Sequence, residues 1–388
     1  MKIFDRSALR LPLYDEPHRA LADRLEAWAE RTPELTGRWR GAAPEAAARQ
    51  IAALLGGDGW LELAIARTRA GSPGPDFRTV CLIREALAYC DDLLDFVFSI
   101  QSLSACAIAS YGSAEQQAAY LPAMRTGSRL GSLAISEPQS SSDIAGIQLV
   151  ARQDGERFRL TGQKAWIAMG SVADFHCVLA RTGSGPAMFG LTLFLVPAET
   201  PGLSAAPAVD LIAPRALSGL VFDDCVVPAS AVIGKPGHGF RYVLEILERY
   251  RVTVAATALG FCRRALAAAV GWSRERRVAD GALFDLQMTK ERLADMMVYL
   301  DTASLLVART AWEIDTGQLD GLSRHAATTK LYATDGAQQV VDRALQLFGA
   351  AGLVSGSIME SLYRQVRALR IYEGTSEIQK LIIAGSLR

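Results

Sequence analysis

The segment Ile371–Gln379, near the C-terminus of this 388-residue chain, holds the residues best suited to chemistry. Ser376 and Gln379 have the spacing of a capping box ahead of an apolar run, so a helix is predicted to begin here with free backbone N–H groups. Glu373 lies just before this cap, between a tyrosine and a glycine that allows close approach. Partial burial would raise its pKa into the range of a general base. The alternative is an ordinary capping turn with a solvated glutamate.

Other kinds of reactive site have little support in the sequence. No G-x-G-x-x-G follows a strand pattern and no G-x-x-x-x-G-K-S/T occurs, so a nucleotide cofactor would need a different binding site. The lack of a G-x-S-x-G elbow disfavours a serine hydrolase of the α/β type. The four histidines and six cysteines show no HExxH or CxxC spacing, so we predict no metal site and expect the cysteines to be small buried thiols.

Composition and charge exclude several classes of protein. Half of the residues are hydrophobic and 21% are charged, which rules out a disordered chain. Because a domain usually has about 100 to 200 residues, the chain should form two or three domains. Lys and Arg number 41, as do Asp and Glu, so no overall charge attracts nucleic acid or an anionic membrane. The first residues lack an apolar signal region, which predicts a cytoplasmic protein.

Hydrophobic periodicity divides the chain into helical, strand-like and again helical thirds. The predicted domains are residues 1–130, 131–238 and 239–388. Asp154 and Gly155 lie between two apolar runs and predict a hairpin. The uncharged run 96–114 contains several serines and is expected to be a buried helix instead of a membrane span. Further helices are expected at 80–93, 242–269, 283–315 and 326–348, and strands at 130–135, 175–180 and 191–196.

Several other segments accompany the C-terminal one, in a fixed order and at characteristic spacings. They are Leu133–Asp143, Gly162–Gly170, Gly234–Phe240, Glu275-Arg276 with Gln287 and Leu293–Met296, Gln346–Gly349, and Tyr363-Arg364. Together with the segment around Glu373, this set resembles the acyl-CoA dehydrogenase family. The resemblance implies an α+β fold with an N-terminal helical domain, a middle β-barrel or sandwich domain, and a C-terminal four-helix bundle.

The resemblance also implies a function. Members of the family use FAD to oxidise the α,β bond of an acyl-CoA thioester to the trans-2-enoyl product, and Glu373 matches their catalytic base. A flavin is needed because it accepts the β-hydride, which no side chain can do. Electrons would pass to an electron-transferring flavoprotein, and the chain would form a homotetramer, a dimer of dimers. Two alternatives stay open: oxidation of a carrier-protein-bound acyl group in a biosynthetic pathway, and a non-catalytic flavin-binding relative.

Other residues match the family's binding positions one by one. The matches to FAD contacts are Leu133, Ile135, Ser136, Ser142, Trp166, Ala168, Arg276, Gln287, Gln346, Leu347, Gly349, Thr375 and Glu377. The matches to acyl-CoA contacts are Ser142, Glu248, Arg251 and Gly374. Taken singly, each has an ordinary structural explanation: Trp166 could be core, Arg276 a solvated charge, Gln346 helix surface, and Glu248 with Arg251 an intrahelical ion pair.

Some positions depart from the family pattern. Tyr250 occupies the site where certain members carry the base instead, and its reference pKa of about 10 makes it a poor base at neutral pH. Ala168 replaces a Ser or Thr whose hydroxyl reaches flavin N5. Further departures are Ala279-Asp280, Ala350 and Gln139-Ser140-Ser141. The length of the acyl group and the identity of its thiol carrier therefore stay open.

Overall fold

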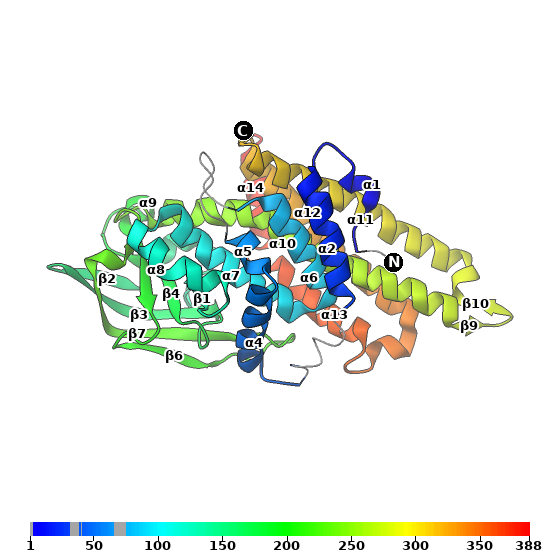
Figure 1. The fold of residues 1–388 in the computed structure, drawn as a ribbon, viewed down its shortest axis with the longest axis horizontal. Helices are drawn as coiled ribbons and strands as arrows, with labels where there is room; N and C mark the ends of the chain where they lie inside the picture. Colours follow the sequence, from blue (N-terminus) through cyan, green and yellow to red (C-terminus); the bar gives the residue numbers. More distant parts are fainter. Residues whose placement is uncertain (1–2, 32–38, 40, 66–74) are drawn as a thin grey trace. The chain divides into compact units, whose positions relative to one another are not determined.

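The computed structural model describes residues 3–31, 39, 41–65 and 75–388 of the chain, drawn in Figure 1. The chain divides into two compact units, and each is described by itself. Unit 1 consists of Met1–Arg38, Phe77–Asp95 and Glu248–Arg388, and unit 2 of Trp39–Asp76 and Phe96–Leu247. The three predicted domains, with boundaries at 130 and 238, stay a prediction.

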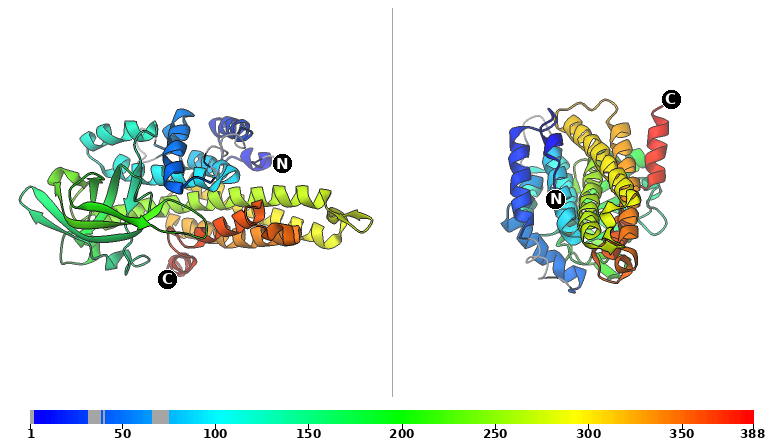
Figure 2. Two further views of the ribbon diagram at one scale, coloured as in Figure 1. Left: turned by 90° about the horizontal axis from the view of Figure 1, so that it is seen from below. Right: turned by 90° about the vertical axis from the view of Figure 1, so that its right-hand side faces the viewer.

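Unit 1 is helical. Helix α2 packs on α6, α6 packs on α11, and α12 packs on α11, α13 and α14; α11 and α12 run alongside each other in Figure 2. The unit also contains the short α1, the first residues of α7 and most of α10, and a small hairpin of β9 and β10. The bounds are α1 Arg6–Leu9, α2 Glu16–Ala29, α6 Phe77–Cys90, α7 Asp92–Tyr111, α10 Gly239–Glu275, β9 Arg277–Val278, β10 Gly281–Ala282, α11 Gln287–Asp315, α12 Leu322–Phe348, α13 Ile358–Val366 and α14 Ser376–Gly385.

The predicted C-terminal helices are all present, with one addition. Helices α10, α11, α12 and α14 correspond to the four predicted from the periodicity. Helix α13 was not predicted, because its nine residues carry only one short apolar stripe. That stripe consists of Met359, Leu362 and Val366, which are spaced at helical intervals and buried.

Two helices among the described residues are long and apolar enough to span a membrane, α7 and α10. In each, most of the apolar stretch is buried within the protein, 78% in α7 and 72% in α10. Core helices of this length pass the same test of composition. The run 96–114 lies mainly in α7, so its prediction as a buried helix is confirmed.

Unit 2 contains an eight-stranded sheet with the order β6-β7-β3-β2-β4-β5-β8, and β1 pairs with β4 in addition. The pairs of β1 and β2 with β4 are parallel and the others are antiparallel. The strands are β1 Gly131–Ala134, β2 Val150–Asp154, β3 Arg157–Ala168, β4 Phe175–Arg181, β5 Leu191–Pro197, β6 Leu203–Ala208, β7 Leu217–Pro228 and β8 Val232–Ile233. The helices of the unit are α4 Pro44–Gly57, α5 Trp60–Ala64, α8 Ala114–Arg125 and α9 Ala187–Gly190, with the remainder of α7 and the start of α10.

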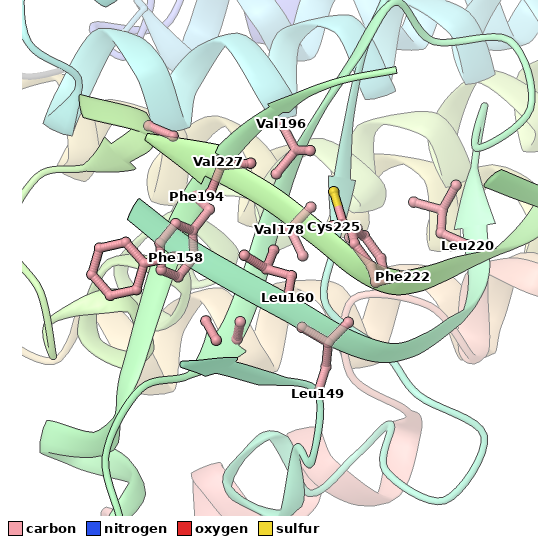
Figure 3. Close-up of a cluster of buried hydrophobic side chains, with 14 of the residues drawn as sticks. Leu149, Phe158, Leu160, Val178, Phe194, Val196, Leu220, Phe222, Cys225 and Val227 are labelled. Atoms are coloured by element: carbon pink, nitrogen blue, oxygen red, sulfur yellow. The ribbon is translucent and has the colours of Figure 1, made fainter. Parts of the chain in front are cut away.

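The core of the sheet is a cluster of alternating apolar side chains, shown in Figure 3. Within this cluster, Phe158 of β3 and Phe194 of β5 meet edge to face, with 5.0 Å between ring centroids. The predicted hairpin joins β2 to β3: Asp154 pairs with Arg157, and Gly155 has φ +60° in the turn. A positive φ at the first turn residue is readily adopted by glycine and suits a two-residue hairpin loop.

Strand β3 carries a bulge that determines how Trp166 is presented. The register with β7 shifts between Lys164 and Ile167, so β3 has one extra residue there. Trp166 lies in this bulge with φ +61°, and 57% of it is exposed. A left-handed backbone is uncommon for a residue with a bulky side chain, and an exposed indole leaves a large apolar surface in water. The interpretation of Trp166 as a core residue is therefore wrong.

Candidate active site

Glu373 lies in a tight turn between the last 3-10 turn, Arg367–Arg370, and helix α14. Glu373 and Gly374 are both left-handed, with φ +54° and +89°. A Cβ on Gly374 would approach Gln379 Nε2 to 2.7 Å, so the second position requires glycine. Lys330 Nζ and Gln379 Nε2 each donate to the Gly374 carbonyl at 2.8 Å, and these two bonds hold the strained turn.

The cap of α14 differs from the sequence prediction. Thr375, instead of Ser376, is the N-cap, and its hydroxyl accepts from Ile378 N. Ser376 donates to Asp335 Oδ1 at 2.6 Å, and the Gln379 side chain binds the turn carbonyls. The predicted capping box is therefore wrong: the N-cap lies one residue earlier, and its N3 position is Ile378, whose side chain cannot bond back to the cap.

The Glu373 carboxyl group is in the state that a general base requires. Its Oε2 atom is buried and has no hydrogen-bond partner among the described residues. Burial raises the pKa of Glu373 to about 7, against the attraction of Arg84, Lys330 and Arg251. A carboxylate with a pKa near 7 is available as a base at neutral pH and holds a proton well once it has taken one. The alternative of a solvated capping glutamate is therefore wrong.

Two cations approach Glu373 from separate helices. Lys330 of α12 is fully buried, and burial lowers its pKa to about 8 although Glu373 and Asp335 oppose this. Arg251 of α10 is 7% exposed, and its Nε atom has no partner among the described residues. Burial lowers the pKa of Arg251, while the charges of Glu248, one turn earlier on α10, and of Glu373 oppose this, so the predicted intrahelical interaction between Glu248 and Arg251 stays an alternative. Arg251 thus keeps a buried donor free beside the candidate base.

A third cation is bound in a buried pair. Arg84 of α6 donates from Nε to Asp95 Oδ1 at 2.8 Å and from Nη2 to Asp95 Oδ2 at 2.9 Å. Thr253 and Thr257 of α10 complete the cluster: Arg84 Nη1 donates to Thr253 Oγ1 at 2.7 Å, and Thr257 Oγ1 donates to Asp95 Oδ2 at 3.0 Å. The four side chains form a polar network that is buried and hydrogen-bonded throughout.

The predicted flavin residues of unit 2 fall at the ends of β1 and β3. Ser136 O accepts from Ala165 N at 2.9 Å, which brings the stretch Leu133–Ser136 next to Trp166 and Ala168. Lys164 Nζ donates to Ile135 O at 2.8 Å and to Glu137 Oε1 at 2.9 Å, with 0% and 2% of the two charged side chains exposed. Ser142 lies further along the same loop and is exposed.

Glu137 fixes the rest of this loop. Its carboxylate also accepts from the backbone N–H of Gln148 at 2.8 Å and Leu149 at 2.9 Å. Although burial opposes the charge, Lys164 and these amides hold the pKa of Glu137 below its usual value. One buried carboxylate thus ties together both ends of the loop between β1 and β2.

The predicted flavin residues of unit 1 gather at two places. Trp272 Nε1 donates to Leu347 O at 3.1 Å, which joins the end of α10, near Arg276, to the end of α12. Arg276, Gln287 and Gln346 are exposed, and no hydrogen bond or ion pair of their side chains occurs in the described part of the chain. Gly349, with φ +58°, ends α12. The second group, Thr375 and Glu377, belongs to the N-terminal turn of α14.

Glu377 differs from Glu373 in its surroundings. It is exposed, and hydrogen bonds from its own backbone N–H and from Thr375 hold its pKa below the usual value. A carboxylate of low pKa in water is a weak base. The two glutamates are therefore chemically distinct although they are four residues apart.

The sequence reasoning did not identify Arg84, Asp95, Lys330, Glu137 or Lys164. A signal was present for the first two, because each interrupts an apolar helical run: Arg84 follows Leu82-Ile83, and Asp95 follows Leu93-Leu94. A charge on an apolar face needs a buried partner, and this pairing could have been sought. No group of three or more metal-ligating side chains occurs among the residues that the structure describes. The six cysteines, all within the described residues, form no disulfide, and all except the partly buried Cys90 are buried, as predicted.

Comparison with known proteins gives matches along the whole chain. Three family models match in order: the acyl-CoA dehydrogenase N-terminal domain at 15–128, the middle domain at 132–225 and the C-terminal domain at 237–387. The human mitochondrial short-chain specific acyl-CoA dehydrogenase is 34% identical over 336 residues, covering 86% of this chain and 81% of that protein.

Solved structures agree in fold. Butyryl-CoA dehydrogenase from Megasphaera elsdenii superposes with a TM-score of 0.87 at 28% identity, covering 96% of this chain and 98% of that one. Glutaryl-CoA dehydrogenase from Mycobacterium smegmatis in complex with FADH2 has a TM-score of 0.85 at 29% identity, covering 97% and 95%.

These matches define the class of the protein, a flavin-dependent oxidoreductase that acts on CH–CH bonds. The chain belongs to the acyl-CoA dehydrogenase family. The predicted family, fold class, enzyme class and FAD cofactor are thereby confirmed.

Proposed function

We propose that this protein oxidises an acyl-CoA thioester to its trans-2-enoyl-CoA, with Glu373 as the base that removes the α-proton. The observation that carries the proposal is the Glu373 carboxyl group, whose Oε2 is buried without a partner and whose pKa is raised to about 7 by burial. The FAD, when bound, supplies the acceptor for the β-hydride. The residues proposed to contact the acyl-CoA are Ser142, Glu248, Arg251 and Gly374. The role of Arg251 is supported by its buried Nε atom, which has no hydrogen-bond partner among the described residues.

The residues proposed to contact FAD are given for each unit by itself. In unit 2 they are Trp166, whose exposed ring is suited to be covered by a planar isoalloxazine, and the backbone of Leu133, Ile135 and Ser136. Ala168 offers no hydroxyl, so it would contact the flavin without tuning it. In unit 1 the proposed contacts are the exposed donors of Arg276, Gln287 and Gln346, which suit a pyrophosphate and polar cofactor edges. The remaining proposed FAD contacts of unit 1 are Leu347, Gly349, Thr375 and Glu377.

The acyl group is proposed to be short. The relatives whose names specify a substrate act on short-chain, butyryl or glutaryl thioesters. We expect the purified protein to be yellow with about one FAD per chain, and its flavin absorbance to bleach anaerobically with butyryl-CoA faster than with palmitoyl-CoA. The same panel should include butyryl groups on an acyl carrier protein. If only the carrier-bound group bleached the flavin, the result would favour the alternative of a biosynthetic enzyme that acts on carrier-protein-bound acyl groups. If no thioester bleached the flavin, the result would favour the alternative of a non-catalytic flavin-binding relative.

The protein is further proposed to form a homotetramer and to pass its electrons to an electron-transferring flavoprotein in the cytoplasm. Exposed apolar side chains on α11 and α14, Val298, Leu305 and Leu381 among them, support association with further copies of the chain. Light scattering of the FAD-loaded protein should give a mass of about four chains. A stable FAD-loaded monomer would contradict this proposal.

A further inference from the structure

We propose that Lys330 and Asp335 of α12 are positioning residues, which fix the place of Glu373 by holding the main chain around it. The inference rests on the proposed role of Glu373 as the base and adds to it, because both residues act through the backbone of the segment 371–375. The Glu373 Oε2 atom is buried and has no hydrogen-bond partner among the described residues. The place of this carboxyl group therefore depends on the backbone that carries it.

Asp335 joins the two ends of the segment. Its Oδ1 atom accepts from Arg370 Nε at 2.8 Å and from Ser376 Oγ at 2.6 Å. Arg370 is the last residue of the 3-10 turn before the segment, and Ser376 is the first residue of α14 after it. Both bonds go to a carboxylate and are charge-assisted, which makes them stronger than bonds between neutral groups. A single oxygen atom of α12 thus holds the chain on either side of the segment.

Lys330 holds the middle of the segment. Its Nζ atom donates at 2.8 Å to the carbonyl of Gly374, the residue directly after Glu373. Lys330 is fully buried and lies five residues before Asp335 on the same helix. Gln379 of α14 donates to the same carbonyl at 2.8 Å and to Glu373 O at 3.3 Å. Burial lowers the pKa of Lys330 to about 8, and the neutral amine would still carry an N–H for its bond.

The backbone of Glu373 needs this support. Its φ of +54° is left-handed, which is uncommon for a residue other than glycine. Such a conformation persists only where the surrounding structure holds it. Helix α12 packs against both the 3-10 turn and α14, so the contacts of Lys330 and Asp335 come from one continuous element. Because a catalytic group displaced by about 1 Å can lose about a hundredfold in rate, these contacts should matter for catalysis.

The test is the rate at which butyryl-CoA reduces the FAD-loaded protein anaerobically, measured across a range of pH. Asp335→Leu removes the contacts at the ends of the segment, and Lys330→Met removes the contact in its middle. Each should lower the alkaline plateau of the reduction rate by about tenfold to a hundredfold, with FAD content and thioester affinity close to those of the wild type. Asp335→Asn retains an acceptor oxygen and should keep most of the rate.

The pH profile separates position from charge. Lys330 is also a cation that favours the ionised carboxylate of Glu373, and the other charges that act on Lys330 are Asp335, Arg251 and Arg370. Loss of its charge alone would raise the pKa of Glu373, which moves the acid limb to higher pH but leaves the plateau in place. A moved limb with an unchanged plateau, or a loss confined to thioester affinity, would overturn the positioning role of Lys330.

The matched control is Thr329→Val. Thr329 precedes Lys330 on α12 and is equally buried, but its hydroxyl bonds with Thr310 Oγ1 of α11 at 2.8 Å. The control therefore removes a buried hydrogen bond of the same helix without touching the segment around Glu373, and its plateau should equal that of the wild type. If Asp335→Leu and Lys330→Met lowered the plateau no more than Thr329→Val does, the inference would be overturned.

A second measurement does not depend on catalysis. Hydrogen exchange of the backbone amides in 371–379 should be faster in Asp335→Leu and Lys330→Met than in Thr329→Val, because the segment has lost its contacts with α12. Exchange as slow as in the wild type would overturn the inference. If Glu373→Gln were reduced at the wild-type rate, the proposed function would fail, whereas faster exchange would still support the contacts with α12. The two failures are therefore distinguishable.

Discussion

Glu373→Gln is expected to lower turnover of an acyl-CoA substrate by about a hundredfold to ten-thousandfold, the usual contribution of a general base. The amide retains the size and polarity of the carboxyl group but cannot accept the α-proton. Steady-state assays with an artificial electron acceptor would measure the loss. FAD content should be almost unchanged, because the turn is held through backbone carbonyls by Lys330 and Gln379 and not through the Glu373 side chain.

The same variant should be more stable than the wild type above neutral pH. The pKa of Glu373 is raised from its ordinary value near 4.5 to about 7, so the folded protein resists ionisation that the unfolded chain permits. This penalty is absent below pH 4.5, develops between 4.5 and 7 and is complete above 7. Thermal unfolding at pH 8 should therefore show a higher midpoint for Glu373→Gln, whereas at pH 4.5 the two proteins should unfold alike. A variant that is less stable at pH 8 would indicate a structural role.

Lys164→Met is expected to have the largest effect on stability, about 3 to 5 kcal/mol. The substitution leaves the buried carboxylate of Glu137 without its cation, and the Ile135 carbonyl loses a donor. Because the loop between β1 and β2 carries proposed flavin contacts, FAD occupancy should fall as well. Chemical denaturation at a fixed concentration of added FAD would measure the change in the free energy of unfolding.

Arg159→Met is the matched control for that experiment. Arg159 lies on the same strand, β3, and forms ion pairs with Asp154 and Asp224, but all three side chains are exposed. Solvent screens such pairs, so the control should unfold almost like the wild type. If the two variants had the same free energy of unfolding, the buried Lys164–Glu137 pair would contribute no more to stability than the exposed ion pairs of Arg159.

The sequence predicted those features that depend on local pattern. The Asp154-Gly155 hairpin, the long helices and the position of Glu373 before a helix all follow from periodicity and turn chemistry. The cap at Thr375 was misassigned because Ser376 is bound by Asp335, a residue 41 positions away in the sequence. Such a long-range partner leaves no local signal.

The electrostatic setting of the base could not be predicted for the same reason. Arg84, Arg251 and Lys330 come from three helices, and only packing decides that their charges act on Glu373. The exposed indole of Trp166 was likewise hidden, because a bulge depends on the register with the neighbouring strand β7. The assignment of the base came from the sequence, whereas the reason that its pKa lies near 7 required the structure.

The most direct test of the central claim is anaerobic rapid mixing of the FAD-loaded protein with butyryl-CoA at pH 8, followed at the flavin absorbance. Wild type and Glu377→Gln should bleach at similar rates, because Glu377 is exposed and has a lowered pKa. Glu373→Gln should bind the thioester and perturb the flavin spectrum but bleach at least a hundredfold more slowly, roughly the minimum loss expected without a general base. Rapid bleaching by Glu373→Gln together with a slow Glu377→Gln would contradict the assignment of Glu373 as the base.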